Sequence, residues 1–356
     1  MKSNRLIRLI AVLVFSITST LGAMHALAAE SAVAYVSNQD GGVSIIGLDT
    51  LSVIGELTGG GGSPRGIGVT DDGKHVLTAN RDSADLSVFD VATGKLINSI
   101  PIGQNPEFVR VRGNRAFVTY EPSSKGGPPP KPGEEEADDD DDEAKIPAGI
   151  AMVDIKNHKV IGTIISGPET EGLEFSADGK QLIVTNEGDD TIRIYGLPKG
   201  KHIKTISTKK QGPRPRGIKI SPDGKTYAVT LEYGDKVMML SKNFKPLKVI
   251  QTGKTPYGVA FDKDGKNLFV AASREKQLQV FDAKTYASVK NIDTGDRCWH
   301  FTFTPDNSKI LLACGKSNEV IVIDAQSLEV VKRIDGLKMP WGVVTYPKAL
   351  GSIDAP

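Results

Sequence analysis

Short apolar runs separated by polar turns recur along nearly the whole chain. Many of the runs are rich in β-branched residues, as in Leu182–Thr185 and Val320–Ile323. Asp-Gly pairs such as Asp178-Gly179 and Asp223-Gly224 separate one run from the next. Asp-Gly supplies the positive φ that a short hairpin turn requires. The pattern therefore predicts antiparallel strands joined by hairpins, with no helix between them.

A short step, Pro-x-Gly in its commonest form, opens one apolar run in each repeat, at intervals of about 40 residues. The seven copies of the step are Pro64-Arg65-Gly66, Pro106-Glu107-Phe108, Thr170-Glu171-Gly172, Pro215-Arg216-Gly217, Pro256-Tyr257-Gly258, Cys298-Trp299-His300 and Pro340-Trp341-Gly342. Each copy is followed by a turn and further strand-like runs. A repeat of this length with strand content is typical of a β-propeller.

The order of the runs also predicts how the ring closes. The repeats begin at a second strand, Ala34–Asn38, and end with an unmatched first strand, Trp341–Tyr346. Pairing these two would complete one blade and remove the open sheet edges. We therefore predict an all-β fold over residues 29–347, a seven-bladed β-propeller of four-stranded antiparallel blades. Its C-terminal strand pairs with the N-terminal blade, and residues 348–356 form a tail.

The N-terminal residues have the pattern of a signal peptide. Three basic residues precede an apolar stretch, Leu9–Ile17, and Ala26-Leu27-Ala28 fits a cleavage site. The apolar stretch is too short to span a membrane. We predict a signal peptide at 1–28 and an exported, periplasmic, monomeric protein without a membrane span. Basic and acidic residues number 44 and 43, and no nucleic acid partner is expected.

One insertion interrupts the repeats at residues 122–146. It is rich in proline and glycine and then carries nine acidic residues within Glu134–Glu143. Such composition predicts a disordered loop. It is interpreted either as a solvated loop, as a docking arm for a basic periplasmic protein such as a soluble cytochrome, or as a lid over the channel mouth.

The middle residue of the step varies between copies, and in a propeller it would lie at one channel mouth. This column is Arg65, Glu107, Glu171, Arg216, Tyr257, Trp299 and Trp341. Arginine can bind carboxylates or phosphates, aromatic rings can stack on a planar ligand, and glutamate can orient hydroxyls or take a proton. We predict ligand binding here, with Arg65 and Arg216 as an anion site. The alternative is a channel plug of mutually neutralised Arg–Glu pairs.

Other side chains are expected near the same face. His300 occupies a column that is glycine in five of the seven copies, so its ring either protrudes into the mouth or fills space. Second strands end at Asn38, Asn80, Glu121, Asn186, Glu187, Glu232 and Arg274. The asparagines in this set are interpreted mainly as turn caps.

The two cysteines begin and end one predicted hairpin. The turn at Pro305–Ser308 places Cys298 opposite Cys314. Directly opposed residues in antiparallel strands are close enough for a disulfide, which export would favour. The alternative is a thiol pair that binds a soft metal together with His300. A Cys-x-x-Cys-His motif is absent, so covalent c-type haem is not expected.

Tyr35-Val36-Ser37-Asn38 and Ile183-Val184-Thr185-Asn186 resemble the name-giving motif of the YVTN-repeat β-propellers. The resemblance covers residues 31–347 and implies the propeller fold. The final copies, through Pro340-Trp341-Gly342, look like a periplasmic subgroup associated with quinoprotein alcohol oxidation, which implies PQQ as a cofactor candidate. The family also includes seven-bladed lactonases.

No Ser-His-Asp order, zinc motif or phosphate loop is visible, and no metal site is predicted. The sequence therefore favours a non-catalytic periplasmic propeller that binds a small anionic or planar ligand, or a protein partner, at one mouth. This role would be accessory to quinoprotein-dependent oxidation. The enzymatic alternative is a lactonase-like hydrolase or a quinone-binding oxidoreductase that uses the Glu, Arg, His and Trp residues of the mouth.

Overall fold

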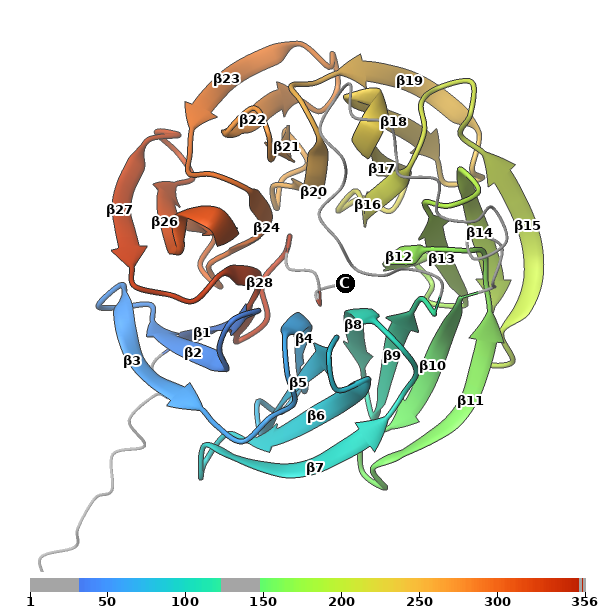
Figure 1. Cartoon of the computed structure of the whole chain (residues 1–356). Coiled ribbons are helices and arrows are strands. Elements are labelled where there is room, and N and C mark those ends of the chain that lie inside the picture. The colour runs from blue at the N-terminus through green and yellow to red at the C-terminus, as the bar shows by residue number, and fades with distance from the viewer. Residues whose placement is uncertain (1–31, 123–147, 352–353, 355–356) are drawn as a thin grey trace, which may run out of the picture. The chain divides into compact units, whose positions relative to one another are not determined.

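The computed structural model describes residues 32–122, 148–351 and 354. Its strands form seven four-stranded antiparallel sheets arranged in a ring, which confirms the predicted seven-bladed β-propeller (Figure 1). The predicted signal peptide at 1–28 and, apart from Pro122, the insertion at 122–146 lie outside the described residues. Among the residues that are described, no helix is long and apolar enough to cross a membrane.

The blades follow one another along the chain, each numbered from its inner to its outer strand. The first three consist of β28 (Pro340–Tyr346), β1 (Val33–Asn38), β2 (Val43–Gly47) and β3 (Ser52–Leu57); β4 (Pro64–Val69), β5 (His75–Asn80), β6 (Asp85–Asp90) and β7 (Lys95–Pro101); and β8 (Pro106–Arg112), β9 (Arg115–Tyr120), β10 (Gly149–Asp154) and β11 (Lys159–Ile165).

The other four blades have the same order. They consist of β12 (Thr170–Phe175), β13 (Gln181–Asn186), β14 (Thr191–Gly196) and β15 (Lys201–Ser207); β16 (Pro215–Ile220), β17 (Thr226–Leu231), β18 (Lys236–Ser241) and β19 (Pro246–Gln251); β20 (Pro256–Phe261), β21 (Asn267–Ala272), β22 (Gln277–Asp282) and β23 (Ser288–Asp293); and β24 (Cys298–Phe303), β25 (Lys309–Cys314), β26 (Glu319–Asp324) and β27 (Val330–Asp335). Two 3-10 turns, η2 (Glu232–Gly234) and η3 (Gly315–Ser317), follow second strands.

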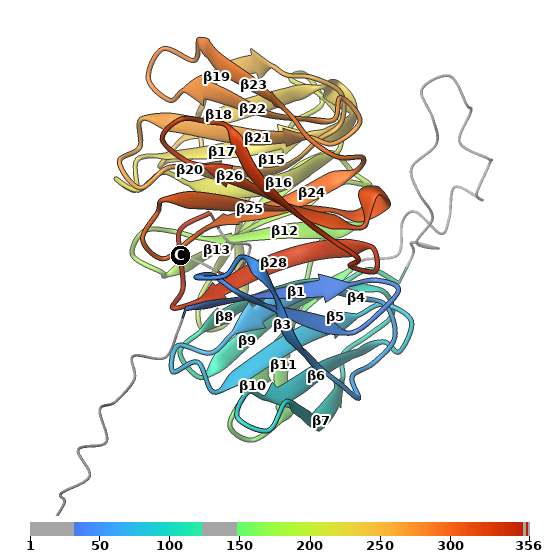
Figure 2. The same cartoon turned by 90° about the vertical axis from the view of Figure 1, so that its left-hand side faces the viewer.

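The ring closes as the sequence predicts. Strand β28 pairs antiparallel with β1, with Tyr35 opposite Val344 and Val36 opposite Val343. Figure 2 shows red β28 beside blue β1, although these strands come from opposite ends of the chain. The predicted tail contributes to the core. The Asp354 carboxylate accepts hydrogen bonds from the backbone N–H groups of Val69, at 2.8 Å, and Val111, on the inner strands of two neighbouring blades.

The core lies between neighbouring blades. Inner and second strands are almost wholly buried, whereas outer strands such as β15 are mostly exposed. One cluster joins Leu77 and Val88 of the second blade to Val109 and Val118 of the third. Each blade therefore buries its apolar faces against its neighbours, and the inner strands converge on the central channel.

The glycine of the Pro-x-Gly step permits this close approach. A Cβ added to Gly217 would overlap the carbonyl oxygen of Tyr257 on the next inner strand. We predict that Gly217→Ala lowers the free energy of unfolding by about 1–3 kcal/mol. Gly55→Ala is the control, because its nearest neighbour would be Ile45 Cδ1 at an ordinary 3.6 Å. Urea denaturation of both variants provides the measurement, and equal losses would contradict this packing argument.

Candidate active site at one channel mouth

Two local features turn the chain into each inner strand at the mouth. The residue before every step has a positive φ, between 49° and 58°, and the seven residues are Ser63, Asn105, Glu169, Arg214, Thr255, Arg297 and Met339. All but one of the inner strands then show a register shift immediately after the first step residue, for example between Pro64 and Ile67. In the closing blade, the shift lies between Ser37 and Asn38 of the paired strand. Bulges of this kind redirect side chains.

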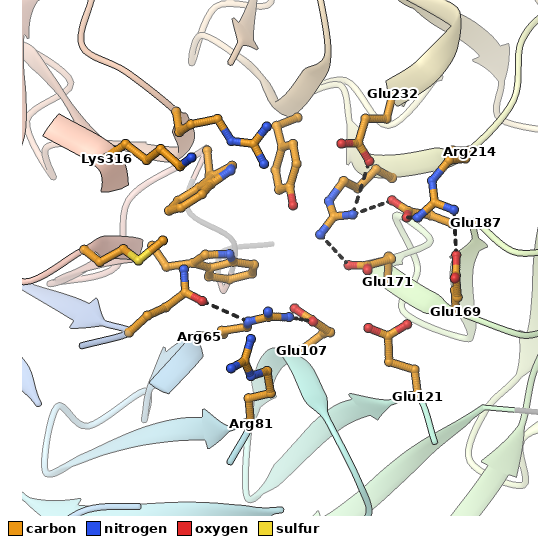
Figure 3. A pocket seen from close by; sticks show the side chains of 17 residues that line it. Arg65, Arg81, Glu107, Glu121, Glu169, Glu171, Glu187, Arg214, Glu232 and Lys316 are labelled. Atoms are coloured by element: carbon orange, nitrogen blue, oxygen red, sulfur yellow. Dashed lines mark hydrogen bonds and ion pairs between the residues drawn. The ribbon is translucent and has the colours of Figure 1, made fainter. Parts of the chain in front are cut away.

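The mouth contains a cavity of about 230 Å³ (Figure 3). Seventeen residues line it: Gln39, Arg65, Arg81, Glu107, Glu121, Glu169, Glu171, Glu187, Arg214, Arg216, Glu232, Tyr257, Arg297, Trp299, Lys316, Met339 and Trp341. The structure thus brings together all seven residues of the variable step column. They come from seven different blades and meet only because the ring closes.

His300 does not line this cavity. Its ring packs against Trp341, with the ring centroids 4.4 Å apart, and against Phe108 at 5.2 Å and Tyr257 at 5.7 Å. It lines a smaller neighbouring cavity together with Lys219. Burial lowers the pKa of His300 well below its ordinary value, so the imidazole is neutral. The expectation that His300 binds the mouth ligand is therefore not met: the ring supports the aromatic wall from below.

Arg65 and Arg216 are not available as an open anion site. Arg216 forms ion pairs with Glu187 at 2.6 Å and with Glu171 and Glu232 at 3.3 Å each. Arg65 pairs with Glu107 and donates to Gln39 at 3.2 Å. This part of the prediction was wrong, because carboxylates from neighbouring blades already neutralise both guanidinium groups.

A second buried arginine extends this network. Arg214 contacts Glu187 at 2.5 Å and Glu169 at 2.8 Å. Glu187 therefore bridges Arg214 and Arg216, as Figure 3 shows. Buried ion pairs of this type are geometrically specific, because removing one partner leaves an uncompensated charge.

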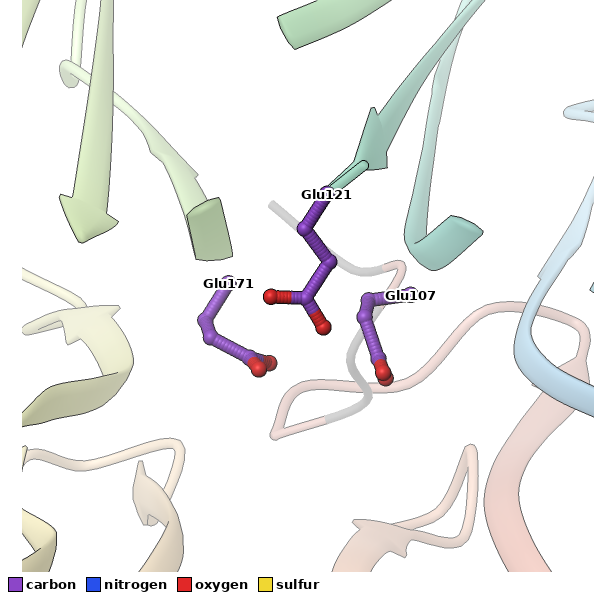
Figure 4. Close-up of side chains that lie close together, drawn as sticks. All are labelled: Glu107, Glu121 and Glu171. Atoms are coloured by element: carbon purple, nitrogen blue, oxygen red, sulfur yellow. The ribbon is translucent and has the colours of Figure 1, made fainter. Parts of the chain in front are cut away.

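Three of the carboxylates point toward one another. Oxygens of Glu107, Glu121 and Glu171 lie within 4.8 Å of one another, and all three side chains are buried (Figure 4). Burial, followed by the like charges of Glu169 and Glu187, raises the pKa of Glu121 to about 8. Burial also raises the pKa of Glu171 well above its ordinary value. This cluster therefore retains a proton at neutral pH. Its spacing could also hold a divalent cation, although Arg65 and Arg216 already supply counter-charges.

Several buried polar atoms of the lining residues have no hydrogen-bond partner among the described residues. The donors are the Nε atoms of Arg214, Arg216 and Arg297 and Trp299 Nε1, and the acceptors include Glu107 Oε2 and Glu232 Oε1. Buried polar groups normally find partners in a protein. The cavity therefore suits a ligand that both accepts and donates hydrogen bonds, as a ring with several hydroxyl groups does.

The cavity has one aromatic wall, formed by Tyr257, Trp299 and Trp341. The Arg216 guanidinium lies 3.9 Å from the centre of the Tyr257 ring. A disulfide joins Cys298 to Cys314, the pair that the predicted hairpin places opposite each other. Cys298 directly precedes Trp299, and Cys314 directly precedes Gly315, against which the Trp299 indole packs. The disulfide therefore supports the aromatic wall from behind.

Several lining residues were not predicted from the sequence. Arg214, Glu169 and Arg297 precede the step and lie in the left-handed position. Their recurring place before the step was the signal that could have identified them. Glu121, Glu187 and Glu232 were expected near this face at second-strand ends, and the structure places all three in the cavity.

Comparisons with known proteins agree with the fold. A family model described as a YNCE-like β-propeller matches residues 13–114, and one described as the cytochrome D1 haem domain matches residues 147–299. A search of curated proteins gave no match. The matches and the solved neighbours confirm the chain as a β-propeller of the YVTN-repeat type.

Solved structures with this architecture include two described as lactonases. A putative 6-phosphogluconolactonase from Bacteroides uniformis is 18% identical, with a TM-score of 0.71, and the match covers 89% of this chain and 100% of that one. The periplasmic gluconolactonase PpgL of Pseudomonas aeruginosa is 16% identical, with a TM-score of 0.68 and coverage of 90% and 99%. At these identities the likeness establishes the fold alone.

A third neighbour is the dihydro-haem d1 dehydrogenase NirN. It is 18% identical, with a TM-score of 0.60, and the match covers 88% of this chain and 74% of that one. These comparisons overturn the expectation of a non-catalytic binding propeller. Lactonases and a haem d1 protein fit the catalytic alternative better.

The raised pKa of Glu121 predicts a pH-dependent stability. Between its ordinary pKa of 4.5 and about 8, the unfolded chain has released a proton that the folded chain keeps. Stability should therefore fall as pH rises through this window, by up to about 1.4 kcal/mol per pH unit from this group. Glu121→Gln lacks the titrating proton. Its Tm relative to wild type should rise from about pH 5 to about pH 8 and then level off.

Thermal unfolding at a series of pH values measures this difference. Glu56→Gln, an exposed carboxylate on β3, is the control and should show no such trend. A Tm difference for Glu121→Gln that stays constant with pH would show that Glu121 is ionised in the folded protein.

The position of the disulfide generates a further prediction. Replacing Cys298 and Cys314 together by serine should lower the free energy of unfolding by about 2–4 kcal/mol. It should also change tryptophan emission, because both tryptophans of the chain line the cavity. Urea unfolding followed by intrinsic fluorescence records both effects. Unchanged emission in the folded variant would mean that the wall does not depend on the disulfide.

Proposed function

We propose that this protein is a hydrolase that opens small sugar lactones at the channel mouth. The observation that carries the proposal is the combination of unpartnered buried donors and acceptors with proton-holding carboxylates in one small cavity. A hydroxylated ring matches the polar atoms, and the aromatic wall offers a surface for its apolar face. The lactonase neighbours are compatible with this chemistry.

The family match to a haem d1 domain was tested against the cavity. A volume of about 230 Å³ lies below the roughly 300–1,000 Å³ of ordinary small-molecule pockets. A tetrapyrrole is far larger than a sugar ring. His300, a residue type that commonly ligates haem iron, lies outside the lining, and none of the described lining residues is His or Cys. The residues present do not fit a haem, and a sugar lactone is the better candidate.

Lactone hydrolysis needs two proton transfers. Water adds to the ring carbonyl carbon, the ring C–O bond breaks, and the ring oxygen leaves as a hydroxyl of the resulting hydroxy acid. Glu107 pairs with the Arg65 guanidinium, an arrangement that favours the ionised carboxylate, and is assigned as the base that takes the proton from water. Glu121 keeps its proton at neutral pH and is assigned as the acid that protonates the leaving oxygen.

Tyr257 and Arg216 can stabilise the developing negative charge on the carbonyl oxygen. Burial raises the pKa of Tyr257, so its hydroxyl remains a donor. Arg216 is held by three carboxylates and stacks on Tyr257, so both groups are fixed before the substrate binds. Donors fixed in this way are an effective source of transition-state stabilisation.

Export to the periplasm is part of the proposal. It is supported by the basic start, apolar stretch and cleavage site of residues 1–28, and by the likeness to a neighbour described as a periplasmic gluconolactonase. The disulfide is also in keeping with an oxidising compartment.

The test is hydrolysis of a sugar 1,5-lactone, followed in a pH-stat with the spontaneous rate subtracted. We expect Glu107→Gln and Glu121→Gln each to lower kcat by about 10²–10⁴-fold. The exposed Glu56→Gln variant should match wild type. Hydrolysis no faster than the spontaneous rate, together with tight binding of PQQ, would instead support the quinone-binding alternative and contradict the proposal.

A further inference from the structure

The charges that line the cavity are balanced in number but not in place. Six lining residues are basic and six are glutamates. Arg65 is matched by Glu107, and Arg214 and Arg216 share four further carboxylates. Arg81 pairs with Asp82, which lies outside the lining. Arg297 and Lys316 are left, and neither forms an ion pair with a carboxylate of the described residues at this mouth.

Arg297 is held at the cavity wall by its backbone. It occupies the left-handed turn before β24, with φ of 53°, and its side chain is buried, with 8% exposed. The guanidinium carbon lies 5.8 Å from the centre of the Trp299 ring, and Nε has no hydrogen-bond partner. A buried guanidinium without a carboxylate partner is costly unless a ligand supplies the missing negative charge.

Lys316 reaches the same wall from a different segment. It lies in η3, and Figure 3 shows its side chain directed toward the aromatic wall. The Gly315 N–H donates to the Arg297 carbonyl oxygen at 2.9 Å, so η3 and the turn of Arg297 are tied together. Between them, Trp299 is only 4% exposed, and its Nε1 donor has no partner.

We propose that Arg297, Lys316 and Trp299 Nε1 form a subsite for an oxyanion, a carboxylate or phosphate group carried by the substrate. The inference rests on the proposed function and narrows it to lactones of acidic or phosphorylated sugars. The opposite wall holds the carboxylates, so the acidic group and the reacting carbonyl lie at different ends of the ligand. Arginine and indole N–H groups are both suited to oxyanion oxygens.

The overall charge of the cavity supports this orientation. Because Glu121 keeps a proton at neutral pH, the glutamates contribute fewer negative charges than the six basic residues contribute positive ones. The surplus positive charge lies at Arg297 and Lys316. An acidic substrate is therefore attracted to the mouth and oriented by the same two residues.

The experiment compares three substrates on three variants. The substrates are a neutral hexonolactone, its 6-phosphate and a uronic acid lactone. Arg297→Gln and Lys316→Gln should each raise KM for the acidic substrates by about tenfold or more and leave KM for the neutral lactone within about twofold. Lys338→Gln, an exposed lysine beside the mouth that does not line the cavity, is the matched control and should behave as wild type. Preference between the two acidic substrates identifies the oxyanion.

Product binding gives a second readout that does not need turnover. The two tryptophans of the chain both line the cavity, so quenching of their fluorescence by the neutral and acidic hydroxy acids reports binding there. Equal KM values for acidic substrates in wild type and both variants would overturn the subsite and leave lactone hydrolysis intact. Arg297-dependent binding of an acidic product without hydrolysis of any lactone would retain the subsite and overturn the proposed function.

Discussion

The left-handed residue before each inner strand is the constraint on which the mouth depends. Seven non-glycine residues adopt this conformation at equivalent positions. Such a conformation is unfavourable for most side chains and persists where the surrounding structure enforces it. Here it turns the chain into the inner strand and, together with the bulge that follows, brings the step residues to one cavity. The repetition of one local turn therefore creates a site that no single blade could form.

The chemistry of the site follows from burying many charges in a small space. Ion pairs in a protein interior gain less than their Coulomb attraction suggests, because both ions lose their hydration. Arg214 and Arg216 meet this cost with bonds to several carboxylates. Glu121 lacks a guanidinium partner in ion-pair contact among the described residues and accepts only the Asn105 amide at 2.9 Å, so its proton is retained. One cavity thus holds an ionised and a protonated carboxyl group side by side.

Much of the fold could be predicted from the sequence, because the repeat, the Asp-Gly turns and the strand count are local patterns. The variable step column was also visible, and the structure places Arg65, Tyr257 and the rest of it around one cavity. The pairing of Arg216 with Glu187 and Glu232 could not be predicted, since it joins neighbouring blades through side-chain geometry. Arg297 was passed over because a left-handed turn leaves no clear mark on a non-glycine residue.

The acidic and neutral states of the clustered carboxyl groups are the central claim, and difference infrared spectroscopy tests it most directly. At neutral pH in heavy water, the wild-type protein should show a carbonyl band from a protonated, buried carboxyl group. The band should disappear as pH rises through about 8 and should be missing from Glu121→Gln at every pH. A wild-type spectrum without this band at neutral pH, or a band unaffected by Glu121→Gln, would contradict the account.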